Sequence, residues 1–373
     1  MKKKLLLWCG AFVSLALLMT SCQKEPASIV KIQDHPNDHI LDSFQVFATG
    51  LNNPRGLKFG PDSMLYVAEG GIGGKNSTAG QCTQVIPPIG PYTGAPTGGR
   101  ISKIDSYGKR FTVTDQLPTT QTSDTSGALV SGVGDIAFCG KDLYALITGG
   151  GCSHANTFPN SLVKINPDGS NKIIADLSKW IRENPVKSPE QDDSEPDGDW
   201  YSMIQLNGAF YAVEANHGQL VKITPTGNIK RVVDVSATYG HIVPTSVAVC
   251  GDFFIGNLNP FPIIEGSSSV YKVTSSGNIS VHTTGFSTIL GLVFDKQGNL
   301  YVLENTTGNP FPTPGTGKVI RVDKSGNKTT IASGLVLPTG ITIGPDGSLY
   351  VSNVGFGPFS TKGAGQILRM HLK

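Results

Sequence analysis

The sequence lacks an excess of charge of either sign: its 373 residues include 30 Lys and Arg against 28 Asp and Glu. A nucleic-acid-binding protein would carry a basic field, so this balance argues against that class. Three enzyme signatures are also missing, because the chain has no Gly-x-Ser-x-Gly elbow, no Gly-x-Gly-x-x-Gly before a helix and no Cys-x-x-Cys. Helical periodicity is scarce, whereas Gly (46) and Pro (24) are abundant. This composition favours an all-β protein with many turns.

A second long apolar run is missing as well, and the one at the N-terminus is short. Leu5–Met19 spans 15 residues, whereas a transmembrane helix needs about 20. The run follows Lys2-Lys3-Lys4 and precedes Thr20-Ser21-Cys22, an order typical of a secretory signal. A Cys directly after small residues resembles a bacterial lipoprotein signal. We predict that residues 1–21 are removed and that Cys22 is lipidated; an ordinary signal peptide or a membrane anchor is the alternative.

The expected mature chain has two parts. Removing residues 1–21 takes away three of the 30 basic residues and no acid, which leaves 27 against 28. Residues 22–42 are polar and without sustained periodicity, as in a tether, and residues 43–373 form the domain. We expect an exported, monomeric cell-envelope lipoprotein, held in the outer membrane by its N-terminal lipid and facing the periplasm or the cell surface. No nucleic-acid partner is expected.

A short motif, an apolar residue followed by an aromatic and a second apolar residue, recurs along the chain. Its six copies are Leu65-Tyr66-Val67, Leu143-Tyr144-Ala145, Phe210-Tyr211-Ala212, Phe253-Phe254-Ile255, Leu300-Tyr301-Val302 and Leu349-Tyr350-Val351. The last three intervals are 43, 47 and 49 residues, the length of a propeller blade. With four strands in each repeat, the sequence predicts a six-bladed β-propeller.

The sixth repeat ends at Lys373 before a fourth strand, and a matching strand stands at the start of the domain. Phe44–Ala48 precedes Pro54-Arg55-Gly56 in the way that the fourth strand of the fifth repeat precedes Pro338-Thr339-Gly340. We therefore predict that Phe44–Ala48 pairs with Gln366–His371, which closes the ring and removes its open edge.

Six cysteines are present, two of them in the signal and lipidation segment. Cys82 and Cys152 lie in Gly-rich loops after the second strands of the first two repeats, and an exported protein can form a disulfide between such loops. Two unpaired thiols are the alternative. Cys139 and Cys250 each follow an apolar run and are expected to be buried free thiols.

Polar side chains end most of the second strands. The positions two residues past the repeated motif are Glu69, Ile147, Glu214, Asn257, Glu304 and Asn353. We expect them to meet at one mouth of the central channel, where Arg55, His217 and His241 would join them. Three carboxylates, Glu69, Glu214 and Glu304, suit a hard cation such as Ca²⁺ or Mg²⁺. In the structural alternative, each Glu binds a backbone amide or an Arg at its own strand end.

The expected first residues of the six first strands contain no His. They are Arg55, Gly134, Trp200, Thr245, Leu290 and Thr339. This absence disfavours a quinone-dependent sugar dehydrogenase.

Several longer segments resemble the ScyD/ScyE family, which is named for two proteins of a cyanobacterial pigment cluster. They are Gly50–Gly56 with Tyr66–Glu69, Val243–Val249, Asn259-Pro260-Phe261-Pro262, Leu300–Glu304, and Leu335–Ile341 with Leu349–Asn353. The likeness covers roughly residues 44–373 and implies an exported six-bladed propeller, with little guidance on function. More distantly, the chain is similar to NHL-type, lactonase and lyase propellers. Asn257 departs from the acid that relatives tend to have there, which weakens a shared acid-ring mechanism.

The sequence thus favours a lipid-anchored propeller that binds a small molecule or glycan at the Glu- and Asn-lined mouth. A metal-dependent hydrolase or lyase is one alternative, with the cation held by Glu69, Glu214 and Glu304. A protein-interaction scaffold that uses the loops at 71–99 and 305–317 is the other.

Overall fold

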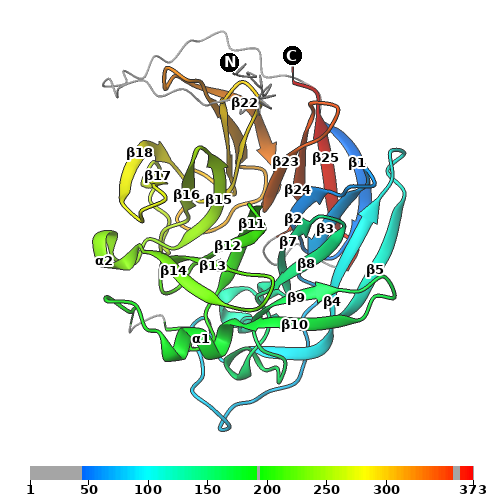
Figure 1. Ribbon diagram of the computed structural model, residues 1–373, viewed down its shortest axis with the longest axis vertical. Coiled ribbons are helices and arrows are strands. Elements are labelled where there is room, and N and C mark those ends of the chain that lie inside the picture. The colour runs from blue at the N-terminus through cyan, green and yellow to red at the C-terminus, as the bar shows by residue number, and fades with distance from the viewer. Residues whose placement is uncertain (1–43, 191–193, 356–361, 373) are drawn as a thin grey trace, which may run out of the picture.

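Each of the six repeats folds into one antiparallel sheet, and the six sheets stand around a common axis as the blades of a propeller (Figure 1). The computed structural model describes residues 44–190, 194–355 and 362–372. Five sheets have four strands, and the first blade carries a short fifth strand at its outer edge. The predicted six-bladed β-propeller is therefore confirmed.

Within a blade, strands one to four run from the channel to the rim. Blade one contains β2 (Pro54–Phe59), β3 (Leu65–Glu69), β4 (Thr93–Ile104), β5 (Arg110–Gln121) and β6 (Val130–Ser131). Blade two contains β7 (Val133–Cys139), β8 (Asp142–Ile147), β9 (Ser161–Ile165) and β10 (Asn171–Asp176). Blade three contains β11 (Trp200–Leu206), β12 (Ala209–Glu214), β13 (Gln219–Ile223) and β14 (Ile229–Asp234).

The second half of the ring repeats this order. Blade four contains β15 (Pro244–Cys250), β16 (Asp252–Asn257), β17 (Ser268–Val273) and β18 (Ile279–Phe286). Blade five contains β19 (Ile289–Phe294), β20 (Leu300–Glu304), β21 (Gly317–Val322) and β22 (Lys328–Leu335). Blade six contains β23 (Gly340–Ile343), β24 (Leu349–Asn353), β25 (Gly365–Met370) and β1 (Gln45–Leu51).

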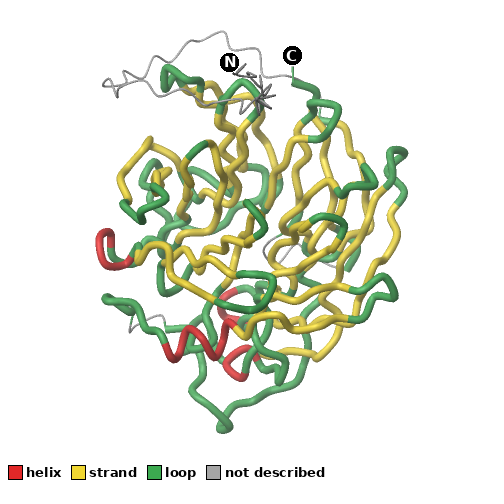
Figure 2. The backbone as a smooth tube through the Cα atoms, viewed as in Figure 1, coloured by secondary structure: helices red, strands yellow, loops and turns green. Residues whose placement is uncertain are grey.

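Helical segments are short and lie in the connections (Figure 2). They are α1 (Leu177–Glu183), α2 (Ser236–Tyr239) and single 3₁₀ turns at Asp124–Ser126 and Cys152–His154. Within the described ranges, no helix has the length and apolarity that crossing a membrane requires.

The two ends of the described chain close the ring. β1 pairs antiparallel with β25, with Gln45 opposite Arg369 and Leu51 opposite Gly365; the blue and red strands lie side by side in Figure 1. The N-terminal strand therefore completes the last blade, as predicted. Because Gln45 faces the end of β25, the chain joins the propeller on the face where strands one and two turn.

Aromatic residues of the repeated motif pack each blade against the next. The rings of Tyr144 in blade two and Phe210 in blade three lie 4.5 Å apart, in a cluster that contains the fully buried Trp200. Tyr211 packs in the same way on Phe253 of blade four, at 4.6 Å. Apolar burial between blades, with aromatic contacts added to it, explains why the motif recurs.

The first strand of five blades begins with a register shift against strand two. The shifts fall between Pro54 and Leu57, Val133 and Asp135, Trp200 and Ser202, Pro244 and Ser246, and Ile289 and Gly291. Such a bulge inserts an unpaired residue and re-aims the side chains that follow. Simple alternation therefore does not tell which side chains face the channel at this end.

Candidate functional site

The first predicted carboxylate, Glu69, is turned onto its own blade. It is fully buried and accepts hydrogen bonds from the N–H of Asn52 (2.6 Å) and from Nε of Arg100 (2.8 Å), with which it forms an ion pair. The hydroxyl of Ser102 also donates to it. Since Asn52 lies two residues before the first strand of blade one, Glu69 fixes the loop that leads into that strand.

Glu214 likewise fixes the loop that leads into the first strand of blade three. Its carboxylate accepts hydrogen bonds from the N–H groups of Asp199 (3.0 Å), Asn216 (3.1 Å) and His217 (2.9 Å), and Oε1 lies 3.2 Å from Nδ1 of His217. Burial acts to lower the pKa of His217, but the adjacent Glu214 carboxylate outweighs it and the pKa is raised. The imidazole of His217 thus contacts the Glu214 carboxylate beside the loop that leads into blade three.

Glu304 in blade five has fewer partners. It is 3% exposed and accepts one hydrogen bond, from the N–H of Ser287 at 2.7 Å. Burial raises the pKa of Glu304 to about 7, although Lys318, which lies opposite it on β21, acts to lower it.

The two asparagines at the corresponding strand ends also form hydrogen bonds within their own blades. Asn257 donates to the carbonyl of Ile242 (2.9 Å), and Asn353 accepts from the N–H of Val336 (2.9 Å). The structure therefore gives Glu69, Glu214, Glu304, Asn257 and Asn353 one local task each, the fixing of the loop before a first strand. The apolar member of the set, Ile147, is fully buried in the core. His241 is half-buried in the bend before β15.

A cation site at the mouth would need several of these acids together. Among the residues that the structure describes, no three His, Cys, Asp or Glu side chains are grouped so that they could hold a metal ion. Glu69, Glu214 and Glu304 are instead satisfied or held separately on blades one, three and five. The donor set does not fit Ca²⁺ or Mg²⁺, and no chemical step is assigned to a metal.

The channel itself is nearly closed. Its cavity of about 20 Å³ is lined by first-strand residues, among them Leu57, Asp135, Leu290 and Ile341. Asp135 accepts from the N–H groups of Ile136 and Met203, both at 2.8 Å, and burial raises its pKa. A Cβ on Gly56 would lie 1.9 Å from Oδ1 of Asp135, so glycine is required there. The cavity is large enough for a single water molecule.

Above this closed channel, polar side chains from three blades gather in a group that we call the channel entrance. It consists of Arg55, Thr148, Asp199 and Tyr201. Arg55 donates to the hydroxyl of Tyr201 (3.3 Å) and to the carbonyl of Val130. Thr148 donates to Oδ1 of Asp199 at 2.8 Å.

Two acidic groups at the channel entrance have raised pKa values. Burial raises the pKa of Asp199 to about 7, and the charge of Glu195 adds to the effect. Burial also raises the pKa of Tyr201; Arg55 opposes this and the charge of Asp199 reinforces it. The chain itself links the two hydrogen-bonded pairs, because Tyr201, the partner of Arg55, follows Asp199 by two residues. A carboxyl that titrates near neutral pH, beside a guanidinium and a phenol, can exchange a proton and bind hydroxyl or carboxyl groups.

Behind Asp199 lies a buried cluster of His154, Glu195 and Tyr92. His154 places Nδ1 2.8 Å from the carbonyl of Gly150 and Nε2 3.1 Å from Glu195, to which the Tyr92 hydroxyl also donates at 2.9 Å. Both ring nitrogens lie within hydrogen-bond distance of oxygen atoms, an arrangement that favours the doubly protonated ring. Burial acts to lower the pKa of His154, but Glu195 raises it above its ordinary value. The His154–Glu195 pair joins the loop between β8 and β9, which carries His154, to the segment that carries Glu195. Tyr92 binds the same carboxylate from the loop that precedes β4.

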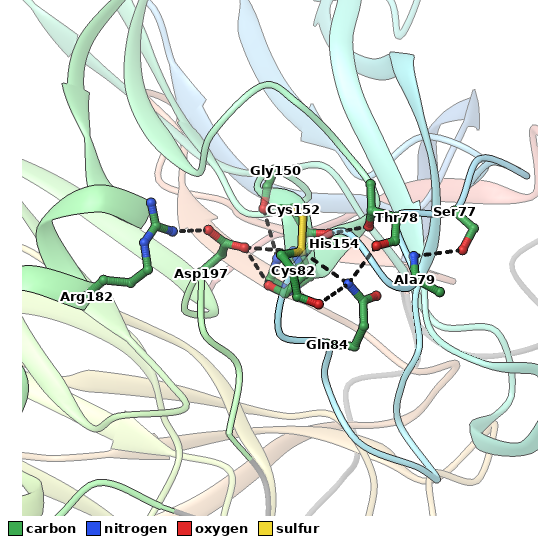
Figure 3. The surroundings of a disulfide bond; sticks show 11 residues. Ser77, Thr78, Ala79, Cys82, Gln84, Gly150, Cys152, His154, Arg182 and Asp197 are labelled. Atoms are coloured by element: carbon green, nitrogen blue, oxygen red, sulfur yellow. Dashed lines mark hydrogen bonds and ion pairs between the residues drawn. A yellow bond between two sulfur atoms is a disulfide. The ribbon is translucent and has the colours of Figure 1, made fainter.

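A disulfide between Cys82 and Cys152 joins the loop between β3 and β4, which also carries Tyr92, to the loop between β8 and β9, which carries His154 (Figure 3). The structure thus joins the two cysteines that the sequence analysis paired. Next to it, Asp197 accepts hydrogen bonds from the N–H and hydroxyl of Ser153 and forms an ion pair with Arg182 (Figure 3). Cys139 is a free, partly buried thiol, as expected, whereas Cys250 is not among the free cysteines of the described residues, so the expectation of a free thiol there is wrong.

Sequence reasoning identified Arg55 but missed Asp199, Thr148 and Tyr201. Trp200 was the expected first residue of its strand, and it is fully buried in the core. The register shift between Trp200 and Ser202 interrupts the alternation of side chains, and Tyr201 lines the channel cavity. Asp197-Gly198-Asp199, directly before Trp200, could have indicated an acidic group at the start of this strand. These residues were not predicted because they follow other acidic residues of the same loop.

The fold and this polar entrance above a closed channel define the class: the protein is a six-bladed β-propeller. No family model matches the sequence, and no curated protein matches it significantly. Among solved structures, the chain is similar to a Thermus thermophilus protein described as an oxidoreductase (glucose dehydrogenase), with TM-score 0.54, 16% identity, and 88% of this chain and 99% of that chain covered. It is also similar to a Xanthomonas campestris gluconolactonase, with TM-score 0.51, 8% identity, and 88% and 89% of the chains covered. At these identities the likeness concerns the fold alone.

Proposed function

We propose that this protein is an exported, lipid-anchored propeller of the ScyD/ScyE type that binds a small polar molecule at the channel entrance. The observation that carries the proposal is the convergence of Arg55, Thr148, Asp199 and Tyr201 from blades one, two and three. Unlike the carboxylates that fix the loops, Asp199 is only partly buried by its neighbours. It therefore remains available to a ligand at the top of the closed channel.

The chemistry of the entrance favours a ligand that carries both hydroxyl and carboxyl or carbonyl oxygens. Arg55 and Tyr201 supply donors, and Asp199 supplies either a donor or an acceptor according to its protonation state. Because the cavity below is water-sized, the ligand lies on the entrance and does not enter the channel. Sugar acids and their lactones have this combination of groups.

A thermal-shift panel of sugar acids, lactones, hydroxy acids and free sugars tests the proposal, since ligand binding raises the melting temperature by mass action. At least one compound should raise the melting temperature of the wild type and of the control Asp346→Asn, which changes a carboxylate on the opposite face. The same compound should not shift Asp199→Asn or Arg55→Gln. Equal shifts in all four proteins, or none in any, would contradict the proposal.

Lactone hydrolysis is a second candidate, because Asp199 has the pKa of an effective general base at neutral pH. The gluconolactonase among the structural neighbours makes glucono-lactone the first substrate to assay. Hydrolysis should rise with pH through about 7 and be lost in Asp199→Asn. Activity that needs an added divalent cation would point to a metal-dependent reaction instead.

A test of the anchor is independent of the ligand. The wild type should fractionate with membranes and incorporate labelled fatty acid, whereas Cys22→Ser should do neither. Fatty-acid labelling of the Cys22→Ser protein would refute lipidation at this residue.

A further inference from the structure

Three large apolar side chains stand out on the loops of blades four and five. Ile264 is 69% exposed, Phe311 63% and Phe261 36%. The two phenylalanines occupy the same place in two copies of one tetrapeptide, Asn259-Pro260-Phe261-Pro262 and Asn309-Pro310-Phe311-Pro312. We call these three side chains with their two loops the Asn-Pro-Phe-Pro surface.

Hydrogen bonds hold both loops in place beneath the exposed rings. The N–H of Ile263 donates to the carbonyl of Pro310 at 2.7 Å and so ties one copy to the other. Asn259 donates to the hydroxyl of Ser267 at 2.9 Å, and the hydroxyls of Thr306 and Thr316 lie 2.7 Å apart. The rings are therefore presented on a preformed scaffold, which reduces the entropy lost when a ligand binds.

A half-satisfied carboxylate lies beside this scaffold. Glu304 receives its one hydrogen bond at Oε1, from Ser287, and within the described ranges no side chain or backbone group donates to Oε2. The hydroxyl of Ser287 in turn accepts from the N–H of Gly266, next to Ile264 in the loop. Oε2 of Glu304 is not among the buried polar atoms that lack a partner, so it is open to solvent and can accept a hydrogen bond from a ligand hydroxyl.

The remaining groups of the surface are neutral and polar. Residues 258–267 and 305–316 contain one charged side chain, Glu265, among Asn, Ser and Thr. Exposed aromatic faces pack well on the C–H faces of pyranose rings, while amide, hydroxyl and carboxylate groups bind the equatorial hydroxyls around them. We propose that the Asn-Pro-Phe-Pro surface is a second binding site, for a saccharide chain, with Phe261 and Phe311 as stacking platforms.

Two features favour a saccharide over a lipid surface or a protein. The chain joins the propeller at Gln45, on the face opposite these loops, so the N-terminal anchor proposed above would attach on the far side of the domain from this surface. An apolar protein surface placed over Glu304 would leave its second oxygen without a donor.

Binding of the purified full chain to immobilised malto-, cello-, xylo- and chitohexaose, followed by calorimetry with any that bind, tests the proposal. Phe261→Ala and Phe311→Ala should each weaken binding at least tenfold, and Glu304→Gln should weaken it less. Tyr107→Ala removes an aromatic residue that is 94% exposed elsewhere on the surface and should leave binding unchanged. Asp199→Asn should also leave it unchanged, so that failure here is distinguishable from failure of the channel entrance.

The proposal is overturned if the wild type binds none of these hexasaccharides, or if both Phe variants bind them as the wild type does. Loss of binding to phosphatidylethanolamine–phosphatidylglycerol vesicles in Phe311→Ala, without saccharide binding by the wild type, would instead assign the surface to a membrane. Melting temperatures of the variants close to that of the wild type confirm that each change acts on the surface and not on folding.

Discussion

Replacing Glu304 by Gln should stabilise the protein increasingly as the pH rises above about 4.5, with the full effect reached above about pH 7. The native pKa of this carboxyl is about 7 against an ordinary value of 4.5. A raised pKa means that the native state holds the proton more tightly than the unfolded state, so the wild type loses stability as the pH rises from about 4.5 to about 7. A difference of this size corresponds to about 3 kcal/mol, at about 1.4 kcal/mol for each pKa unit.

The direction of the pKa shift of Glu304 determines the pH range in which the substitution changes stability. The contribution of the protonated carboxyl is complete below the unfolded pKa and is lost as the pH rises through about 7. Gln copies the neutral form and can still accept from Ser287. Urea unfolding should therefore give nearly equal free energies for Glu304→Gln and the wild type at pH 5. At pH 8.5 the variant should be more stable by up to about 3 kcal/mol.

Glu69→Gln is the matched control because Glu69 occupies the same position in blade one with a full set of partners. Its loss leaves Arg100 without a charge partner, which should destabilise the protein by about 3 kcal/mol at both pH values. If Glu304→Gln is instead destabilising at pH 8.5, or if the two free-energy differences do not change with pH, the burial argument for Glu304 is refuted.

Three further predictions concern the loops and the ring. Glu214→Gln should lower the free energy of unfolding by about 1–3 kcal/mol, because backbone donors at Asp199, Asn216 and His217 lose a charged acceptor; an unchanged value in denaturant titrations would contradict the anchoring role. Deleting residues 23–50 should lower the melting temperature far more than deleting 23–42, since only the longer cut removes β1, and equal melting temperatures would argue against closure by this strand. Cys82→Ser should lose about 2–4 kcal/mol, and alkylation of the unreduced wild type at Cys82 or Cys152, detected by mass spectrometry, would show that the bond does not form in solution.

The repeated motif made the propeller predictable because its aromatic residue has one physical task in every blade, packing on the next blade. The closing strand was predictable for a related reason: Phe44–Ala48 precedes the same turn sequence as the fourth strand of blade five. Both features depend on short sequence patterns that can be recognised without knowledge of the structure.

The site was less predictable because the direction of a side chain depends on the bulges at the start of the first strands. The sequence placed Glu69, Glu214 and Glu304 at the correct ends of their strands but could not show that backbone N–H groups meet them there. Asp199 and Tyr201 lie beside a bulge. Because a bulge inserts an extra residue, the alternation of inward and outward side chains cannot be used to predict where these two side chains point. Their pKa values depend on burial beneath loops that are distant in sequence.

The most direct test of the account is a crystal structure of the purified protein soaked with the compound that raises its melting temperature most. We expect electron density for that compound in contact with Arg55, Asp199 and Tyr201 above the closed channel. Density for the compound at Glu69, Glu214 or Glu304, with the channel entrance empty, would contradict it.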